Sequence, residues 1–131
     1  MFLDTSGLLC YLHGPEPGHA DAVRHMMASA RRLTHSYVLA ELVALAQARG
    51  LPRPPILEFL SRLGDDLGIE VVYVDEALHR VAVDLLSRRL DKTYSLCDAV
   101  SFILMRDRGL ADALTTDHHF EQAGFVRLLR P

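Results

Sequence analysis

Two kinds of pattern alternate along this chain. Some segments are short, apolar or rich in β-branched residues and stop at polar or turn-forming residues, which predicts β-strands. These segments cover residues 1–4, 32–36, 69–74, 113–116 and 125–128. Between them, apolar residues recur at helical spacing, which predicts helices. These helices are expected at residues 7–12, 19–30, 37–48, 55–67, 76–90, 95–105 and 117–122, with N-caps at Ser6, Ser36, Asp75 and Ser95.

Strands that alternate with helices are typical of an α/β fold. We therefore expect a central, mainly parallel sheet of about five short strands with helices on both faces. Neither a linker nor an internal repeat nor a low-complexity segment interrupts the pattern, so residues 1–131 are expected to form a single domain. The 50% share of apolar residues and the 24% share of charged residues are ordinary for such a domain and do not change this prediction.

No apolar run approaches the roughly 18 to 20 residues that a membrane-spanning helix needs, and the chain does not start with a signal-peptide pattern. We therefore expect a cytoplasmic protein with no membrane partner. The only two cysteines, Cys10 and Cys97, have apolar neighbours and are expected to be buried thiols rather than a disulfide or a metal pair.

The net charge of −3 is unfavourable for a protein that coats nucleic acid through a broad basic face. It does not exclude an enzyme that acts on nucleic acid, because an acidic site that holds divalent cations attracts phosphate through the metal. Of the fourteen basic residues only Lys92 is a lysine, and arginine suits bidentate phosphate contacts.

The most informative residues are four carboxylates with apolar neighbours. Asp4 ends the first strand, Asp117 follows the fourth, and Glu41 and Asp98 are each the only charge in an apolar helical segment. An ionised carboxylate in apolar surroundings is costly unless it has a partner. Because the carboxyl ends of parallel strands and the N-termini of the following helices meet at one edge of a sheet, the four acids are expected to converge there.

Each acid also has a local alternative. Asp98 lies three residues after Ser95 and can complete a capping box, Asp117 can cap the last helix, and Asp4 can form an Asx turn. Glu41 lies beyond the first helical turn, where no capping role is available. Converging carboxylates repel one another unless a cation lies between them, and oxygen ligands favour Mg²⁺ or Mn²⁺. The predicted reaction class is metal-dependent hydrolysis of phosphodiester bonds.

Four blocks of the chain resemble the PIN domain, and most of all the VapC-type toxin ribonucleases of toxin–antitoxin systems. In one-letter code these blocks are FLDTS at 2–6, SYVLAE at 36–41, YSLCDA at 94–99 and TTDHHF at 115–120, the last followed by AGF at 123–125. Each block is a weak signal alone. Their order and spacing together are specific, and they extend over almost the whole chain.

The resemblance implies a PIN-like α/β/α sandwich and an endoribonuclease in which a metal-activated water cleaves RNA. The implied ligands of one or two Mg²⁺ or Mn²⁺ ions, which are also the catalytic residues, are Asp4, Glu41, Asp98 and Asp117. The implied supporting hydroxyl residues are Ser6, Ser95 and Thr116. His119 departs from the pattern, because some relatives carry an additional aspartate there.

The resemblance also implies partners. A small antitoxin protein would block the acidic pocket, and the toxin would pair as a homodimer. Apolar residues on the second and fourth helices exceed what one core needs and are candidates for the dimer surface. These residues are Met26, Met27, Phe59 and Leu60.

Other polar residues carry weaker signals. His118 and His119 are adjacent and point in different directions on a helix, so they are not expected to chelate one ion together. His35 is expected to be solvated or at the edge of the core, with a phosphate contact as the alternative. The basic cluster of Arg88, Arg89 and Lys92 is expected to be a solvated helix end, with an RNA contact as the alternative.

Three other functions were compared with the nuclease. A phosphotransferase of the haloacid-dehalogenase kind requires a second acid two residues after Asp4, where this chain has Ser6. A receiver-type signalling module requires an acidic pair after the first strand and a lysine after the last strands, and this chain has neither. A PIN-like module that binds RNA or protein without cutting is the remaining alternative, and an activity assay separates it from a nuclease.

Overall fold

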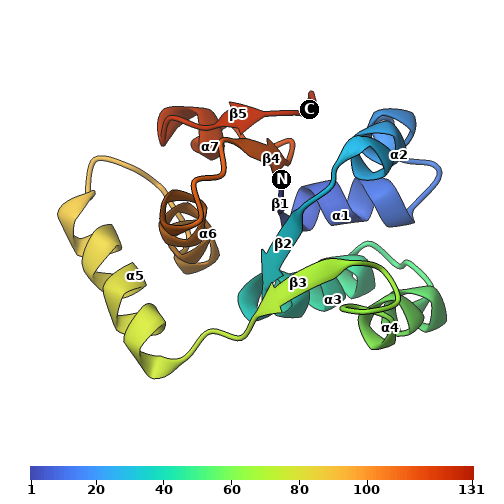
Figure 1. Ribbon diagram of the computed structural model, residues 1–131, viewed down its shortest axis with the longest axis horizontal. Coiled ribbons are helices and arrows are strands. Elements are labelled where there is room, and N and C mark those ends of the chain that lie inside the picture. Colours follow the sequence, from blue (N-terminus) through green and yellow to red (C-terminus); the bar gives the residue numbers. More distant parts are fainter.

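The computed structural model describes residues 1–131 and contains a five-stranded parallel sheet with helices on both faces (Figure 1). The sheet order is β3-β2-β1-β4-β5, and every neighbouring pair is parallel. The strands are β1 (Phe2–Leu3), β2 (Arg32–His35), β3 (Ile69–Val72), β4 (Asp112–Leu114) and β5 (Val126–Arg127). The predicted α/β/α architecture is confirmed. The chain runs outward from β1 in both directions, so the edge beside β1 and β4 is the switch point where ligand sites form.

The structure has seven helices, and they cover the sheet in two groups (Figure 1). One group packs on one face and consists of α1 (Thr5–Leu12), α2 (His19–Ala28), α3 (Ser36–Ala48) and α4 (Arg53–Ser61). The other group consists of α5 (Glu76–Arg88), α6 (Leu96–Asp107) and α7 (His119–Gln122). Helix α6 is the most deeply buried, with eight of its twelve residues buried, which explains why apolar residues dominate its sequence.

One hydrophobic core joins the sheet to both groups of helices. Phe2, Phe102 and Phe120 are buried and form a continuous aromatic cluster, in which the ring centroids of Phe102 and Phe120 lie 5.0 Å apart at 82°. Because these rings come from β1, α6 and α7, the cluster fixes the elements that carry three of the four predicted acids.

Gly7 allows α1 to pack directly against β4. A Cβ atom at this position would lie 1.8 Å from the main-chain oxygen of Leu114, far inside van der Waals contact. Glycine is therefore required here by close approach of two backbones. The contact brings the beginning of α1 next to the end of β4, where the candidate site forms.

Helix α4 is the largest difference from the predicted elements. The pattern predicted a helix at 55–67, whereas α4 begins two residues earlier and ends at Ser61. The chain then turns through Gly64, which has a φ of +84°, and the Gly64 N–H donates to the Ile69 carbonyl at 3.1 Å. This contact pairs the turn with β3, so the apolar residues after Ser61 pack without helical structure.

Two predicted N-caps are wrong because tertiary partners compete for the hydroxyls. Helix α3 is capped by His35, whose Nδ1 accepts the Val38 N–H at 3.3 Å, while the Ser36 hydroxyl accepts the Val74 N–H. Helix α1 begins at Thr5, and Ser6 forms long-range contacts instead. The two other predicted caps, Asp75 and Ser95, are confirmed.

The proposed dimer residues do not form one exposed surface. Met26 and Phe59 belong to the core, and Leu60 is partly buried, whereas the Met27 side chain is 80% exposed. Met26 and Phe59 are therefore not surplus apolar residues, and their prediction as dimer contacts was wrong, because both side chains are buried where α2 and α4 pack against the rest of the protein. No helix in the structure has the length and apolar character to cross a membrane.

Candidate metal centre

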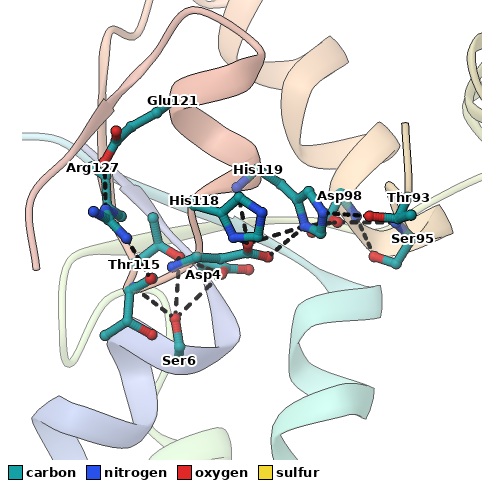
Figure 2. Close-up of polar contacts among 12 residues, drawn as sticks. Asp4, Ser6, Thr93, Ser95, Asp98, Thr115, His118, His119, Glu121 and Arg127 are labelled. Atoms are coloured by element: carbon teal, nitrogen blue, oxygen red, sulfur yellow. Dashed lines mark hydrogen bonds and ion pairs between the residues drawn. The ribbon is translucent and has the colours of Figure 1, made fainter. Parts of the chain in front are cut away.

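The predicted acids lie at the carboxyl-terminal edge of the sheet. Asp4 follows β1, Asp117 follows β4, Asp98 lies in the first turn of α6, and Glu41 lies on α3. Figure 2 shows that Asp4, Asp98 and His119 are brought together from segments far apart in the sequence. We use the name acidic pocket for the group of Asp4, Glu41, Asp98, Asp117 and His119.

Asp4 is almost fully buried at the centre of the sheet, with 6% of its surface exposed. Its Oδ2 accepts hydrogen bonds from the Thr115 hydroxyl at 2.7 Å and from the Ser6 hydroxyl at 3.5 Å. Burial raises the pKa of Asp4 to about 7, and the charges of Asp98 and Glu41 act in the same direction. The two hydroxyls support the carboxylate without neutralising it, so a cation is the natural partner of its ionised form.

Asp98 has a local role and a place in the acidic pocket at the same time. Its Oδ2 accepts the Ser95 N–H at 2.9 Å, and the Ser95 hydroxyl accepts the Asp98 N–H at 3.0 Å, which is a complete capping box. Burial and the charge of Asp117 raise the pKa of Asp98, against the opposing effects of Ser95 and His119. The local and the functional interpretations of this residue are therefore compatible, because the capping box fixes the carboxylate at the pocket.

His119 occupies the space between Asp98 and Asp117. Its Nδ1 lies 3.0 Å from Asp117 Oδ1 and 3.6 Å from Asp98 Oδ2, and its Nε2 lies 2.8 Å from the Thr93 hydroxyl. The Asp117 Oδ1 also accepts the His119 N–H at 2.9 Å, which places Asp117 at the beginning of α7. Because a hydroxyl can donate or accept, Thr93 tolerates either tautomer of the imidazole.

Glu41 lies on the exposed side of the acidic pocket. Its charge contributes to the raised pKa of Asp4 and, after burial, to the raised pKa of the Cys97 thiol. Cys97 is therefore a neutral buried thiol under the pocket, and Cys10 is likewise a buried free cysteine, as predicted. Glu41 is therefore close enough to Asp4 for its charge to raise the pKa of that residue.

The supporting hydroxyls differ in part from those predicted. Thr115, which was not predicted, donates to Asp4 and accepts the Asp117 N–H at 3.0 Å. Thr116 contributes its main chain instead, through an N–H that donates to the Ser6 hydroxyl and a carbonyl that accepts from Arg127. The register pairs Leu3 with Leu114, so the next residues along, Asp4 and Thr115, become neighbours. This register cannot be read from the sequence, so the sequence pattern indicated the adjacent Thr116 instead of Thr115.

Neither His118 nor His35 belongs to the cluster of Asp98, Asp117 and His119. His118 is exposed, with its Nδ1 3.6 Å from Asp117 Oδ1, and its ring packs beside that of His119. His35 is completely buried, its Nε2 is 2.8 Å from the Ser101 hydroxyl, and burial lowers its pKa to about 4. The expected position of His35, in solvent or at the edge of the core, and the alternative phosphate contact were both wrong, because this neutral imidazole is a fully buried helix cap.

The donor atoms fit a divalent cation. One ligand atom from each of Asp98, Asp117 and His119 lies within 4.8 Å of the other two, and Asp4 and Glu41 add negative charge nearby. Two carboxylates and one imidazole form a mixed oxygen and nitrogen donor set, which suits Mn²⁺ and related ions better than a pure oxygen set does. Thr93 would orient the imidazole from its far side.

The fold and the acidic pocket define a known class of proteins. Residues 1–126 match the family model described as PIN domain, and the chain belongs to the PIN-domain family. Within this family it is 32% identical over 130 residues to VapC20 of Mycobacterium tuberculosis, described as a 23S rRNA-specific endonuclease, in both strain H37Rv and strain CDC 1551. The match covers 98% of this chain and 97% of that relative.

The solved structures agree with this result. The crystal structure of M. tuberculosis VapC20, described as a toxin that cleaves the sarcin–ricin loop, superimposes with a TM-score of 0.86 at 30% identity. The superposition covers 99% of this chain and 98% of that chain. The resemblance to VapC-type toxins that the four sequence blocks indicated is confirmed.

Proposed function

We propose that this protein is a metal-dependent endoribonuclease and the toxin of a toxin–antitoxin pair. The observation that carries the proposal is the cluster of Asp98, Asp117 and His119 beside the buried Asp4, at the sheet edge where α/β proteins bind ligands. The similarity to a curated endonuclease over nearly the whole chain supports cutting over mere binding. Residues 1–131 would act as one catalytic unit.

In this proposal Asp4, Glu41, Asp98 and Asp117 are the acidic residues of the catalytic centre. Asp98 and Asp117 hold the cation together with His119, and Asp4 and Glu41 contribute further ligands directly or through water. Ser6, Ser95 and Thr115 support the acids through their hydroxyls, and Thr116 supports Ser6 through its main-chain N–H. A divalent cation held here would supply charge neutralisation at the phosphate and activation of a water for hydrolysis.

The resident cation would be Mg²⁺ or Mn²⁺, as one ion or two. The imidazole of His119 favours Mn²⁺ at the first position. Replacing the imidazole with a carboxylate in His119→Asp should therefore shift the preference toward Mg²⁺. Calorimetric titration of the wild type and of His119→Asp with each metal measures the ratio of the two dissociation constants. An unchanged ratio would mean that His119 does not bind the cation.

The substrate class would be RNA, and by analogy with the relative we propose an exposed loop of ribosomal RNA in the cytoplasm. Loops present unstacked bases that a protein can reach, whereas the narrow major groove of duplex RNA hides them. Intact ribosomes and protein-free ribosomal RNA, incubated separately with the enzyme, would show whether the target needs ribosomal structure.

Cleavage of RNA with and without metal is the direct test. The purified protein, incubated with ribosomal RNA and Mn²⁺ or Mg²⁺, should produce defined fragments that chelator prevents. Asp4→Asn should reduce the rate by at least about 100-fold, since loss of supporting groups alone costs 10- to 100-fold at metal sites. The matched control is Asp21→Asn, because Asp21 is an exposed carboxylate paired with Arg24 on α2. Equal cleavage by both variants would contradict the proposal.

Two protein partners follow from the same proposal. An antitoxin would block the acidic pocket, and it should carry a cationic group that replaces the metal's charge. The second partner would be another copy of this chain in a homodimer, and light scattering at micromolar concentration tests this. A monomer mass would contradict the homodimer without affecting the nuclease.

A further inference from the structure

A cavity lies apart from the acidic pocket, between the end of α5, the loop after it and α6. Its volume is about 280 Å³, and none of the pocket's four acids lines it. The side chains that matter here are those of Arg88, Arg89, Tyr94, Phe102 and Arg106. Ligand pockets range from about 300 to 1,000 Å³, so this one has room for a fragment such as one base, and too little for a folded peptide. We use the name arginine cavity for it.

Three guanidinium groups surround this cavity in a protein of negative net charge. Arg88 pairs with Asp84 and Arg89 pairs with Asp91, and both arginine side chains are substantially exposed. Arg106 forms no ion pair; its guanidinium lies 5.7 Å from the centre of the Phe125 ring and donates one long hydrogen bond to the Ala123 carbonyl. Exposed ion pairs are weak, so these arginines are available to a phosphate.

The walls of the cavity carry an aromatic surface. The rings of Tyr94 and Phe102 meet edge to face with centroids 5.0 Å apart. The Tyr94 hydroxyl has no hydrogen-bond partner in the protein and is closed to solvent, so the ring is the part of Tyr94 that a ligand in the cavity can contact.

Tyr94 also separates the arginine cavity from the acidic pocket. Its ring centroid lies 5.6 Å from that of His119, and the preceding residue, Thr93, contacts the same imidazole. A strand of RNA with one phosphate at the acidic pocket would therefore bring a neighbouring nucleotide to the arginine cavity.

We propose that the arginine cavity binds one nucleotide of the RNA next to the cleaved bond. The phosphate contacts the arginines, and the base packs against the Tyr94 ring. Guanidinium groups with an aromatic face are the combination that recognises single-stranded RNA. An acidic peptide is less well matched, because it would use the arginines and leave the aromatic surface unused. This inference rests on the proposed function only in assigning the nucleotide to a substrate.

The first experiment tests the cavity without any cleavage. The four nucleoside 5′-monophosphates are titrated separately into the full-length protein in chelator, and amide chemical shifts are recorded by NMR. Shifts that saturate at Tyr94, Phe102 and Arg106 are expected, and Arg106→Ala should weaken the binding about tenfold. The control is Arg24→Ala, which removes an exposed arginine on α2 and should leave the binding unchanged.

Two further titrations separate the possible ligands. If inorganic phosphate or an acidic peptide shifts these amides as strongly as the nucleotides do, the cavity binds anions without reading a base, and the proposal is overturned. Absence of saturable shifts for all four nucleotides overturns it as well. Tyr94→Ala should weaken nucleotide binding about tenfold, because it removes the ring on which the base packs. Tyr94→Phe keeps the ring and should bind as the wild type does, with a melting temperature that stays unchanged or rises, because the lost hydroxyl has no protein partner. A lower melting temperature would identify a structural role.

RNA cleavage then distinguishes failure of this inference from failure of the proposed function. In single-turnover reactions Arg106→Ala should raise the protein concentration needed for half-maximal rate about tenfold, with a nearly unchanged rate at saturation. If the wild type cleaves RNA and Arg106→Ala has no effect, the nuclease proposal stands and the role of the arginine cavity in RNA binding is refuted. If nucleotides bind at the cavity but the protein cuts no RNA, the cavity stands as a binding site and the nuclease proposal is refuted.

Discussion

The acidic pocket and the arginine cavity lie on either side of Tyr94 and are built in opposite ways. In the pocket, Asp4 and Thr115 form a hydrogen bond across 111 positions of the sequence, and both are buried. In the cavity, Arg88 pairs with a residue one helical turn away and Arg89 with a residue two positions away. The acids of the pocket are held by contacts across the whole fold, whereas the ion pairs of Arg88 and Arg89 at the cavity are local to one helix end.

This difference indicates how each region responds to a ligand. Buried like charges cannot move apart, so the pocket requires a cation to reach its lowest energy. The exposed ion pairs at the cavity contribute little and are easily exchanged for contacts with phosphate. We therefore expect substitutions at the pocket to change stability and activity together, and substitutions at the cavity to change RNA binding alone.

Gly7→Ala should have the largest effect, because it breaks the long-range assembly of the pocket. The new methyl group would overlap the Leu114 carbonyl and push α1 away from β4. We expect a loss of at least about 3 kcal/mol in the free energy of unfolding, measured with urea. Gly14→Ala is the control, since a Cβ atom there meets nothing within 4 Å, and a similar loss in that variant would refute the explanation.

Asp4→Asn should stabilise the metal-free protein at high pH. The folded-state pKa of about 7 lies above the ordinary value of 3.8, so ionisation of Asp4 destabilises the fold increasingly as the pH rises between these values. Relative to the wild type, the variant should gain about 2 to 4 kcal/mol at pH 8 and nothing at pH 4. Urea unfolding in chelator at both pH values measures this, and a gain that does not depend on pH would contradict it.

Asp98→Asn should raise the melting temperature of the metal-free protein and abolish cleavage. The amide oxygen can still accept the Ser95 N–H, so the capping box survives while the charge repulsion disappears. Asp98→Ala loses the cap as well and should be less stable than Asp98→Asn by about 1 kcal/mol. A lower melting temperature for Asp98→Asn than for the wild type would mean that the cap is the dominant role of Asp98.

Asp91→Asn should have the smallest effect and only on binding. It releases Arg89 from an exposed ion pair, so RNA affinity at low salt should rise about twofold and the melting temperature should not change. Fluorescence anisotropy with a labelled single-stranded RNA measures the affinity. If the affinity falls instead, the carboxylate is needed to position Arg89 for its ligand.

Much of this protein was predictable from local sequence. The alternation of short apolar runs with segments of helical periodicity predicted every strand and helix in order. This works because buried strands are apolar throughout and helices that cover a sheet are apolar on one face. The isolated acids at strand ends predicted the edge where Asp4, Asp98 and Asp117 lie. The caps at Asp75 and Ser95 were also predictable, since both partners of each cap lie within one helical turn.

Contacts between distant segments could not be predicted from local sequence. The register of β1 against β4 made Thr115 the partner of Asp4, and burial in the core converted His35 from a candidate phosphate contact into a neutral cap. The arginine cavity lies where α5, α6 and the end of α7 meet, and no periodic pattern in the sequence predicts that these segments come together. Residue types and local patterns were enough to identify which residues could carry the chemistry, because both can be read within a few positions of the chain. Packing decided which of them meet, because register and helix docking depend on the whole chain.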